Sequence, residues 1–332
     1  MPAAPPAGLP SARGYAIALA SAAVLSTTAI FIRHLTQTYR MPALVLAFWR
    51  DGLVFLTLLA VLAAARPALL PVARRHLAYL AGYGLMLATF NAAWTLSVAL
   101  NGAALSTVLV YSSTAFTALL GRWLLDESLG WGKLVAVTVS LAGCAVVSGA
   151  LDPAAWRTNL TGITAGVLSG LCYAGYSLMG RSASQRGLDP WTTVLHTFGF
   201  AALVLLAVNL LAGGVVPGAA PRPRDLLWLG NAAAGWAALF LLAAGPTLAG
   251  FGLYNVSLGL LPSSVANLIV TLEVPFTAVI AYAVLDERLT AAQLAGSALV
   301  VAGVVLLRLY ETWRAGRDPG LPAVGTEAVP PG

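Results

Sequence analysis

Charged residues are scarce in this sequence. Asp, Glu, Lys and Arg make up 9% of its 332 residues, hydrophobic residues make up 59%, and the mean hydropathy is +0.85. A soluble globular domain carries roughly 25% charged residues, so this chain has too few to cover a water-facing surface. A bilayer is therefore the expected solvent, with crossing segments of about 20 apolar residues. Because backbone groups in lipid must be hydrogen-bonded internally, the crossing segments are predicted to be helices, which makes the fold all-α.

Cysteine and histidine are also rare. The two cysteines, Cys144 and Cys172, lie inside apolar runs without a CxxC pair, which predicts packing thiols and neither a disulfide nor a metal site. The three histidines, His34, His76 and His196, are spread over the chain, and neither HExxH nor GxSxG occurs. A membrane-embedded enzyme would need a nucleophile with its base, or a metal cluster, at depth. The sequence thus disfavours an enzyme and predicts no catalytic residue, metal or cofactor.

Ten apolar runs long enough to cross a bilayer follow one another along the chain. Proline-containing tails at 1–13 and 311–332 are expected to be disordered, and the first lacks the basic start and short apolar core of a signal peptide. A linker at 151–159 separates a first unit, 14–150, from a second, 160–310. The ten helices are expected near 14–32, 42–65, 77–98, 103–125, 133–149, 160–179, 190–211, 234–257, 263–285 and 291–309.

The two units are related by duplication. Residues 97–147 align without a gap with residues 257–307, at an offset of 160 positions (257 − 97). The alignment repeats Phe-Thr-Ala, Ala-Gly and an Asp-Glu pair, at 126–127 and 286–287, that is expected to cap the loop between paired helices. A fixed-period match of this length indicates a duplicated unit.

The front part of each unit repeats at a different offset, 148, because Arg33 and Pro42 fall on Arg181 and Pro190 (181 − 33). Five helices per unit is an odd number, so the two units enter the membrane from opposite sides, as in the inverted repeats of alternating-access transporters. Of the 18 basic residues, 17 lie outside the apolar runs or within three residues of their ends; with the N-terminus inside the cell, eleven are cytoplasmic and six external. This excess favours two cytoplasmic termini rather than a nucleic-acid partner.

Several short motifs are typical of one family. They are Phe48-Trp49-Arg50, Leu272-Glu273, Asp286 to Thr290 (DERLT), and the later Gly296 and Gly303. Over residues 14–309 the chain resembles the EamA type of the drug/metabolite transporter superfamily. The resemblance implies ten transmembrane helices around a central cavity, and export of small metabolites, often amino acids, in bacteria. The family commonly has Glu-Pro where this chain has Glu273-Val274-Pro275, so the kink is expected one residue later.

Glu273 is the leading candidate site residue, because it is a lone carboxylate inside an apolar run. It lies about 16 Å into its helix ((273 − 262) × 1.5 Å), near the midplane of a ~30 Å core. A charged carboxylate at that depth costs roughly 2.5–3.5 kcal/mol, so we expect it to face the bundle interior and to bind a proton or a substrate ammonium group. A hydrogen bond that only packs neighbouring helices is the alternative. Its repeat partner is Ser113, so the duplication alone does not explain the carboxylate.

Arg50 and Asp51 lie about 12 Å into the second run ((50 − 42) × 1.5 Å). Adjacent helical positions diverge by about 100°, so these two side chains need not pair with each other. Arg50 is able instead to pair with Glu273 across the bundle, or to receive a substrate carboxylate with its fork of donors. A purely structural ion pair between helices is the alternative.

Other polar and aromatic side chains inside the runs form a wider set of candidates. His196 aligns with Phe48 and is expected to be a satisfied core or cavity-lining group rather than a proton relay. Some of the rest should line the cavity, where rings suit a flat or hydrophobic substrate, and others should pack or lie at the membrane interface. They are Asn91, Trp94, Tyr111, Ser112, Tyr173, Tyr176, Trp236, Tyr254, Asn255, Asn267 and Thr271.

Glycine and proline mark packing and bending positions. Gly162, Gly166 and Gly170 repeat the GxxxG spacing on one helical face, which predicts a close helix contact inside the bundle rather than dimerisation. Gly245-Pro246 removes a helical hydrogen bond, so it is expected to bend the eighth helix at a place suited to gating motion. Pro275 is expected to act in the same way on the ninth helix.

Together these features predict a secondary transporter of the inner membrane. It is expected to export a small metabolite, in particular an aromatic or hydrophobic amino acid, by alternating access, with protons as the candidate coupling ion and a monomer as the candidate assembly. A multidrug or nucleotide-sugar carrier is the alternative within the superfamily, although a sugar carrier would favour a basic cavity and only Arg50 lies at depth. A membrane-embedded enzyme is the alternative of another class. The inverted repeat disfavours a channel or receptor.

Overall fold

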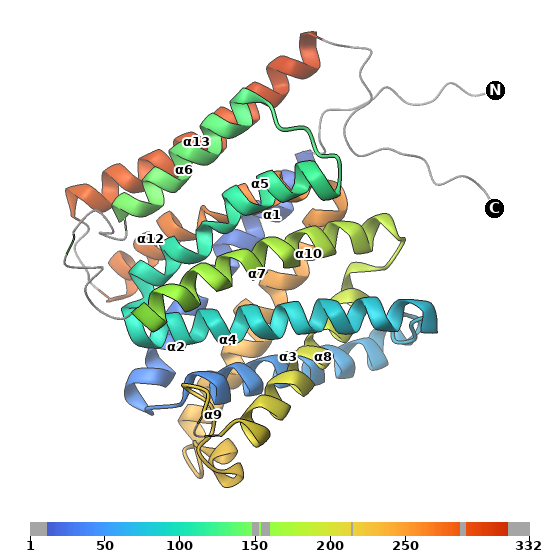
Figure 1. Ribbon diagram of the computed structural model, residues 1–332, viewed down its shortest axis with the longest axis vertical. Helices are drawn as coiled ribbons and strands as arrows, with labels where there is room; N and C mark the ends of the chain where they lie inside the picture. The colour runs from blue at the N-terminus through green and yellow to red at the C-terminus, as the bar shows by residue number, and fades with distance from the viewer. Residues whose placement is uncertain (1–11, 148–152, 154–159, 214, 286–289, 318–332) are drawn as a thin grey trace.

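The computed structural model describes residues 12–147, 153, 160–213, 215–285 and 290–317. Within these residues the chain is helical and contains no strand, as the composition predicts (Figure 1). The elements are α1 (Ala12–Leu25), α2 (Thr28–Thr38), α3 (Ala43–Ala65), η1 (Pro67–Leu69), α4 (Arg74–Tyr111), α5 (Ser113–Leu124), α6 (Trp131–Val147), α7 (Leu160–Gln185), α8 (Pro190–Leu211), η3 (Pro223–Leu227), α9 (Ala233–Leu242), η4 (Ala243–Thr247), α10 (Leu248–Leu260), α11 (Ser263–Val270), α12 (Glu273–Leu285) and α13 (Ala291–Arg317).

Seven helical segments of the described residues are long and apolar enough to cross a membrane. They correspond to predicted helices one, two, three, six, seven, eight and ten. The prediction of an all-α, multi-pass membrane protein is thus confirmed. The fifth predicted helix is α6, with 17 residues, and the fourth and ninth are each divided into two pieces. The count of ten crossings stays a prediction.

The fourth and ninth helices are interrupted at equivalent positions. α4 gives way to α5 at Ser112, and α11 gives way to α12 at residues 271–272, which matches the duplication offset of 160 (272 − 112). In the second unit the cause is Pro275, because proline has no N–H to donate to the carbonyl of Thr271 and its ring clashes with that carbonyl. The interruption falls just before Glu273, so this carboxylate begins a helix.

A reversal of direction lies within α4. The sequence predicts a turn near residues 100–102, whereas α4 is helical without a break from Arg74 to Tyr111. Ser97 and Ser106 are nine residues apart, yet their hydroxyl oxygens lie 2.9 Å from each other. In a straight helix nine residues rise by about 13 Å, so these side chains could not meet. The chain therefore folds back on itself between the two serines, and the predicted reversal is present although the helical backbone continues through it.

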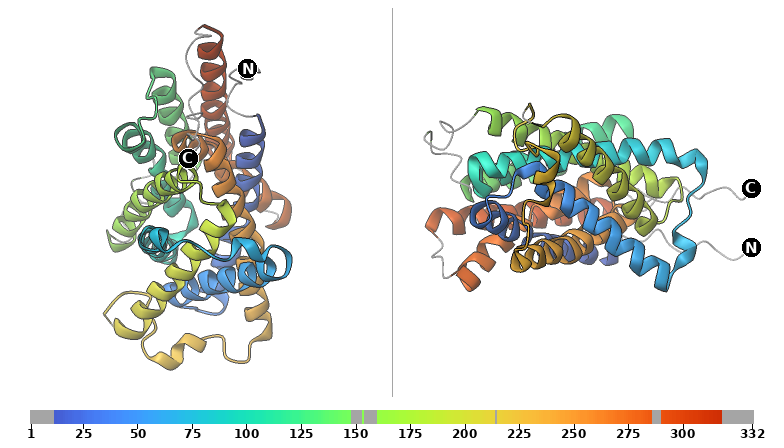
Figure 2. Two further views of the ribbon diagram at one scale, coloured as in Figure 1. Left: turned by 90° about the vertical axis from the view of Figure 1, so that its right-hand side faces the viewer. Right: turned by 90° about the horizontal axis from the view of Figure 1, so that it is seen from below.

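Helices of the first half pack against helices of the second half, and the duplication converts each such pair into itself or into another pair that also packs. α3 packs on α8, α5 on α11 and α6 on α13, which are predicted helices two with seven, four with nine and five with ten. α4 packs on α7 as α10 packs on α1, which are helices three with six and eight with one. Figures 1 and 2 place α6 and α13 side by side at one edge of the bundle. This pattern of contacts is that of two halves related by a pseudo-two-fold axis.

The two ends of the described chain lie at the same end of the bundle. Tyr15 of α1 donates a hydrogen bond to Glu311 of α13, and the guanidinium of Arg308 lies 4.2 Å from the centre of the Tyr15 ring. Residues 311–317, predicted as part of the disordered tail, are instead the last turns of α13. Residues 12 and 13, also predicted as tail, are instead the start of α1. The other tail residues and nearly all of the linker lie outside the described residues. Ends on one side agree with an even number of crossings.

Gly162, Gly166 and Gly170 of α7 face α4. A Cβ atom on Gly166 would lie 2.8 Å from Ser97 Oγ. One on Gly170 would lie 2.8 Å from the carbonyl oxygen of Leu109. Both distances are shorter than real Cβ contacts, so glycine permits the close approach of α7 to the folded-back part of α4. The small residues thus serve a contact within one chain.

Gly245-Pro246 lies in a single π-helical turn, η4, between α9 and α10. Proline leaves a carbonyl of the preceding turn without its usual donor, and the wider turn accommodates this. The Thr247 hydroxyl donates to the carbonyl oxygen of Leu242 at 2.8 Å, five residues earlier. The predicted interruption of the eighth helix is therefore present, and η4 packs against α3, the helix that carries Arg50.

Candidate functional site

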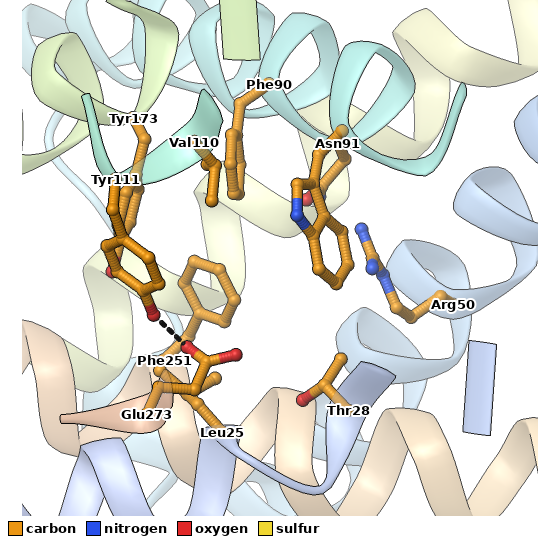
Figure 3. A pocket seen from close by; sticks show the side chains of 11 residues that line it. Leu25, Thr28, Arg50, Phe90, Asn91, Val110, Tyr111, Tyr173, Phe251 and Glu273 are labelled. Atoms are coloured by element: carbon orange, nitrogen blue, oxygen red, sulfur yellow. Dashed lines mark hydrogen bonds between the residues drawn. The ribbon is translucent and has the colours of Figure 1, made fainter. Parts of the chain in front are cut away.

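A cavity of about 40 Å³ is lined by side chains from both halves of the chain (Figure 3). Its wall comes from α1, α2, α3 and α4 of the first half and from α7, α10 and α12 of the second. One water needs about 10–15 Å³ measured in this way, so the space holds a few waters, and a larger occupant requires the walls to move apart. The lining residues are Leu25, Thr28, Arg50, Phe90, Asn91, Trp94, Val110, Tyr111, Tyr173, Phe251 and Glu273.

Glu273 reaches into this cavity from the start of α12. It is half-buried, and it accepts a hydrogen bond from the Tyr111 hydroxyl at 2.5 Å. Its other carboxylate oxygen points toward the cavity interior (Figure 3). The interruption after α11 puts the carboxylate at a helix N-terminus, where the helix dipole favours negative charge. The backbone break, the tyrosine and the sequence position thus together hold an acidic group at the cavity wall.

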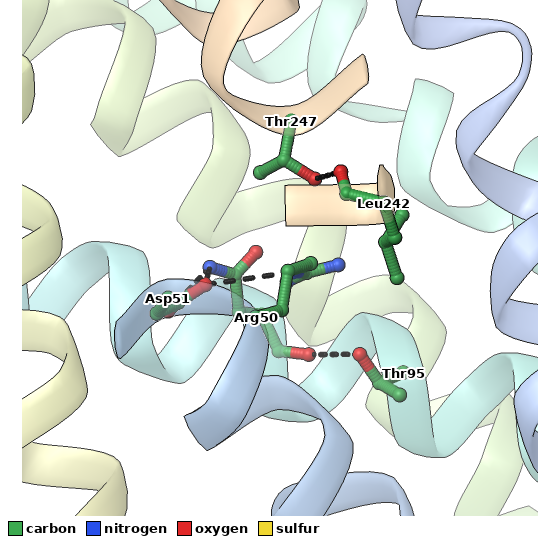
Figure 4. Close-up of polar contacts among 6 residues, drawn as sticks. Arg50, Asp51, Thr95, Leu242 and Thr247 are labelled. Atoms are coloured by element: carbon green, nitrogen blue, oxygen red, sulfur yellow. Dashed lines mark hydrogen bonds and ion pairs between the residues drawn. The ribbon is translucent and has the colours of Figure 1, made fainter. Parts of the chain in front are cut away.

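Arg50 enters the cavity from α3 and is 2% exposed. Its Nε lies 3.4 Å from Asp51 Oδ1, so these neighbours do pair despite their divergent directions on the helix. The Asn91 amide donates to both oxygens of Asp51, at 2.9 and 2.8 Å, and thereby fixes the carboxylate behind Arg50. The guanidinium carbon lies 5.9 Å from the centre of the Trp94 ring, within reach of a cation–π interaction. Figure 4 shows Arg50 between Asp51 and Leu242, the residue just before the π turn, with Thr247, the last residue of that turn, nearby.

No ion pair joins Arg50 to Glu273 in the part of the chain that the structure describes. Instead, the two side chains reach toward the same cavity from opposite sides (Figure 3). Of the three arrangements that the sequence left open for Arg50, direct pairing with Glu273 is therefore not formed. The Arg50 Nη2 atom is buried and has no hydrogen-bond partner among the described residues. One donor of the guanidinium fork is thus left for another group.

A second polar cluster lies beside the cavity and contains three of the predicted site residues, Tyr176, Asn255 and Asn267. The Asn255 amide donates to the Tyr176 hydroxyl at 2.7 Å, and the Tyr83 hydroxyl donates to Asn255 Oδ1 at 3.2 Å. The Asn267 amide donates to Ser177 Oγ at 3.1 Å. All of these side chains are buried. The first group joins α4, α7 and α10, and the second joins α7 and α11, so neither lines the cavity.

Two further predicted residues lie away from the cavity wall. The Thr271 hydroxyl donates to the carbonyl oxygen of Leu268 at 2.6 Å, which supports the break between α11 and α12. His196 Nδ1 lies 2.9 Å from the carbonyl oxygen of Thr192, one turn earlier in α8, and the ring is half-buried. Both contacts are local, and neither brings a polar group to the cavity.

Sequence reasoning missed Leu25, Thr28, Phe90, Val110 and Phe251 as lining residues. For the apolar members the sequence holds no signal, because cavity-lining and core side chains look alike inside an apolar run. For Thr28 a signal exists in the run Ser26-Thr27-Thr28, since hydroxyl side chains that bond the preceding turn weaken a helix. Ser26 Oγ donates to Ala23 O at 2.6 Å and Thr27 Oγ1 to Val24 O at 3.0 Å, and α1 ends at this point.

Comparison with known proteins agrees with this architecture. The model of the EamA-like transporter family matches residues 12–149 and again residues 160–309. The chain belongs to this family. The family match and the seven membrane-length helices identify a multi-pass membrane protein of a transporter family that is built from two repeats.

Two curated relatives are both uncharacterised transporters. One, from Synechocystis, is 26% identical over 230 residues, which is 69% of this chain and 66% of that protein. The other, from Archaeoglobus fulgidus, is 25% identical over 297 residues, which is 88% of this chain and 95% of that protein. One crystal structure superposes on this chain with a TM-score of 0.69 and 17% sequence identity. The match includes 90% of this chain and 98% of the chain in that structure. That likeness concerns the fold.

Proposed function

We propose that the protein is a secondary transporter that exports small metabolites, in particular amino acids, across the plasma membrane by alternating access, with both termini in the cytoplasm. One observation carries the proposal. The guanidinium of Arg50 and the carboxylate of Glu273 enter a single cavity from opposite sides without neutralising each other. An α-amino acid has the complementary pair of charges, a carboxylate for the arginine fork and an ammonium group for the acid.

The aromatic wall supports an apolar or aromatic side chain on the substrate. Phe90 stacks on Tyr173 with ring centres 4.9 Å apart, and Phe251 lies next to them with its centre 6.4 Å from that of Phe90. Rings in this arrangement accept another ring by offset or edge-to-face contact. A substrate side chain directed at these rings would leave its charged groups beside Arg50 and Glu273. The proposed substrate class is therefore aromatic and hydrophobic amino acids.

Glu273 also suits proton coupling in this proposal. A carboxyl group in a cavity can release a proton when a substrate ammonium group arrives and regain one when the substrate leaves. Because both ligands use one carboxylate, they exclude each other, and exchange of one for the other couples their movement in opposite directions. Export driven by proton entry follows from this competition.

A second candidate, export of hydrophobic cations by a multidrug carrier, is favoured by the charge balance of the cavity. Asp51 offsets the charge of Arg50, so Glu273 remains as the uncompensated charge among these three residues. Aromatic rings and one carboxylate suit an organic cation. A nucleotide sugar would need several basic groups for its phosphates, and Arg50 is the single cation among the lining residues of this cavity.

The breaks in the helices suit the motion that alternating access requires. The fourth, eighth and ninth predicted helices are interrupted at Ser112, at Gly245-Pro246 and before Glu273. Half-helices can rotate at such points without disturbing their outer parts. In the proposed cycle the halves rock about the cavity and expose Glu273 and Arg50 to one side of the membrane at a time.

The test is transport by purified protein in proteoliposomes, screened over amino acids and hydrophobic cations with and without a pH gradient. The proposal expects saturable movement of one amino-acid class, faster when protons flow the opposite way. Movement of cations alone would favour the multidrug carrier. Chemical conversion of a compound without its translocation would favour a membrane-embedded enzyme and overturn the proposal.

A further inference from the structure

We propose that the N-terminus of α2, the Thr28 hydroxyl and Arg50 Nη2 form a carboxylate-binding subsite at one end of the central cavity. The inference rests on the proposed function only in taking the carboxylate to be that of the transported substrate. The subsite itself is argued from the break between α1 and α2 and from two buried donors that have no hydrogen-bond partner within the described part of the chain.

The first membrane helix is broken at the cavity. α1 ends at Leu25 and α2 begins at Thr28, and both of these residues line the cavity. The first backbone N–H groups of a helix have no partner within it, and the helix dipole adds partial positive charge there. An anion is stabilised at such an end, as phosphates are at many helix N-termini. α2 has 11 residues, so its dipole is developed.

Two side-chain atoms at this end of the cavity are buried without a hydrogen-bond partner among the described residues. They are Thr28 Oγ1, on a residue that is 5% exposed, and Arg50 Nη2, on a residue that is 2% exposed. Other buried atoms share this condition, but these two belong to residues that line the cavity. Buried polar groups are almost always bonded, so two open donors on one cavity wall indicate a ligand that bonds both. Figure 3 shows the Thr28 hydroxyl directed into the cavity, whose wall also carries Arg50.

The chemistry of the donors selects a carboxylate. Helix N–H groups, a hydroxyl and a guanidinium N–H all donate to an acceptor, and the guanidinium and helix end also attract negative charge. Glu273 repels an anion from the opposite side of the cavity. Asp51 already offsets part of the charge of Arg50, so a singly charged carboxylate matches the subsite better than a phosphate dianion. The Asn91–Asp51 bonds hold Arg50 in place for this contact.

The subsite gives the substrate one orientation. With its carboxylate at Thr28 and Arg50, an α-amino acid directs its ammonium group toward Glu273 across the cavity. Its side chain then faces the rings of Phe90, Tyr173 and Phe251. Thr28 is thus a specificity-determining residue that distinguishes amino acids from the corresponding amines.

Binding to purified protein in lipid nanodiscs tests the subsite with three related probes. The probes are L-phenylalanine, phenethylamine, which lacks the carboxylate, and 3-phenylpropanoate, which lacks the ammonium group. The variant Thr28→Val removes the hydroxyl at nearly constant shape, and Thr28→Ser keeps it. Calorimetry reports the dissociation constants.

Thr28→Val is expected to weaken L-phenylalanine and 3-phenylpropanoate by about tenfold, because a hydrogen bond to a charged group is lost. Phenethylamine binding should stay unchanged, which also shows that the variant is folded, and Thr28→Ser should resemble the wild type for all three probes. The subsite would be overturned if Thr28→Val weakened the binding of all three probes equally, or if it left the binding of both carboxylate probes unchanged. It would also be overturned if the wild-type protein bound neither carboxylate probe. Thr28-dependent carboxylate binding without amino-acid transport in proteoliposomes would leave the subsite standing and contradict the proposed function instead.

Discussion

Glu127 in the first half binds the first turn of α11 in the second. Its Oε1 accepts a hydrogen bond from the backbone N–H of Ser263 at 2.6 Å, and Oε2 accepts one from the N–H of Ser264 at 3.2 Å. Both serine hydroxyls donate to the same carboxylate, which is 5% exposed. The Asp-Glu pair was expected to cap its own loop, but Glu127 instead caps a helix 136 residues away in the chain. Its repeat counterpart lies outside the described residues.

Replacing Glu127 should therefore loosen the contact between the two halves. Glu127→Gln removes the negative charge and places an amide NH₂ group against the N–H and hydroxyl donors of Ser263 and Ser264. We therefore expect the free energy of unfolding to fall by roughly 2 kcal/mol. Asp126→Asn is the matched control: Asp126 is exposed with φ +52°, a conformation that asparagine also adopts readily. Thermal unfolding in detergent should show a lower melting temperature for the first variant alone. Equal melting temperatures would show that the cap does not hold the halves together.

Glu127 illustrates what the sequence could and could not predict about the fold. Apolar length and composition predicted the seven membrane-length helices, because burial in lipid constrains each segment separately. The duplication predicted that Ser112 and Leu272 are equivalent, and both mark helix breaks. The partner of Glu127 was not predictable, because a capping contact between distant segments depends on how the helices are arranged in space.

The candidate site also has a part that the sequence predicts and a part that it does not. Glu273 and Arg50 stood out because ionised groups at the depth of a bilayer are costly, and both line the cavity. Tyr176 and Asn267 are also polar side chains inside apolar runs, yet they bond to other side chains away from the cavity wall. Polarity within a run therefore indicates that a side chain faces protein rather than lipid, but only the packing decides whether it faces a cavity.

The Arg50–Asp51 pair should be needed as a pair rather than as separate charges. Asp51→Ala leaves a buried guanidinium without its counter-charge, and we expect a loss of about 3–5 kcal/mol. Removing both charges in Arg50→Met with Asp51→Ala should recover most of this stability, because no unpaired ion remains. Arg224, which is exposed, and the half-buried Asp225 form a surface pair at 3.9 Å that serves as the control, and neutralising it should have little effect.

A charge exchange separates this pairing from a direct contact across the cavity. Swapping Arg50 and Glu273 should not restore folding, since Arg50 pairs with Asp51 and not with Glu273. Chemical unfolding of the single, double and exchanged variants measures the coupling. Full rescue by the exchange would contradict the arrangement described for the cavity.

Glu273→Gln should abolish the coupling of transport to protons. The amide keeps the size of the side chain and can still bond to Tyr111, but it neither binds a proton nor attracts an ammonium group. We expect transport in proteoliposomes to fall at least tenfold, the order of effect of losing one charged contact, and to lose its pH dependence. Glu311→Gln makes the same chemical change away from the cavity and should keep that dependence. A wild-type rate and pH profile in Glu273→Gln would remove this residue from the mechanism.

The connection between α10 and α11 is held against α7 in the present conformation. Arg181 of α7 donates to the carbonyl oxygens of Leu258 and Gly259, at 3.1 and 3.2 Å. These carbonyls lie at the C-terminal end of α10, where the helix dipole stabilises a positive charge. One turn further, a Cβ atom on Gly259 would lie 3.8 Å from Ser184 Cβ. This separation is the mean for a disulfide, so Ser184→Cys with Gly259→Cys should cross-link here.

The duplication predicts which two residues form the equivalent cysteine pair on the other side of the bundle. Ser184 corresponds to Thr36 (184 − 148), and Gly259 corresponds to Ala99 (259 − 160). Arg33, the counterpart of Arg181, is exposed and donates to Gln37, so this side differs from the first. If the halves exchange conformations during transport, Thr36→Cys with Ala99→Cys should cross-link in the opposite state.

Oxidation of both cysteine pairs in native membranes then measures the exchange. We expect each pair to cross-link in part, and saturating substrate to raise one yield while it lowers the other, because the two contacts belong to opposite conformations. The native Cys144 and Cys172 are buried, and each single-cysteine variant controls for their participation. Complete cross-linking of both pairs in the same molecules would show that the two contacts coexist, and the rocking motion would then have to be abandoned.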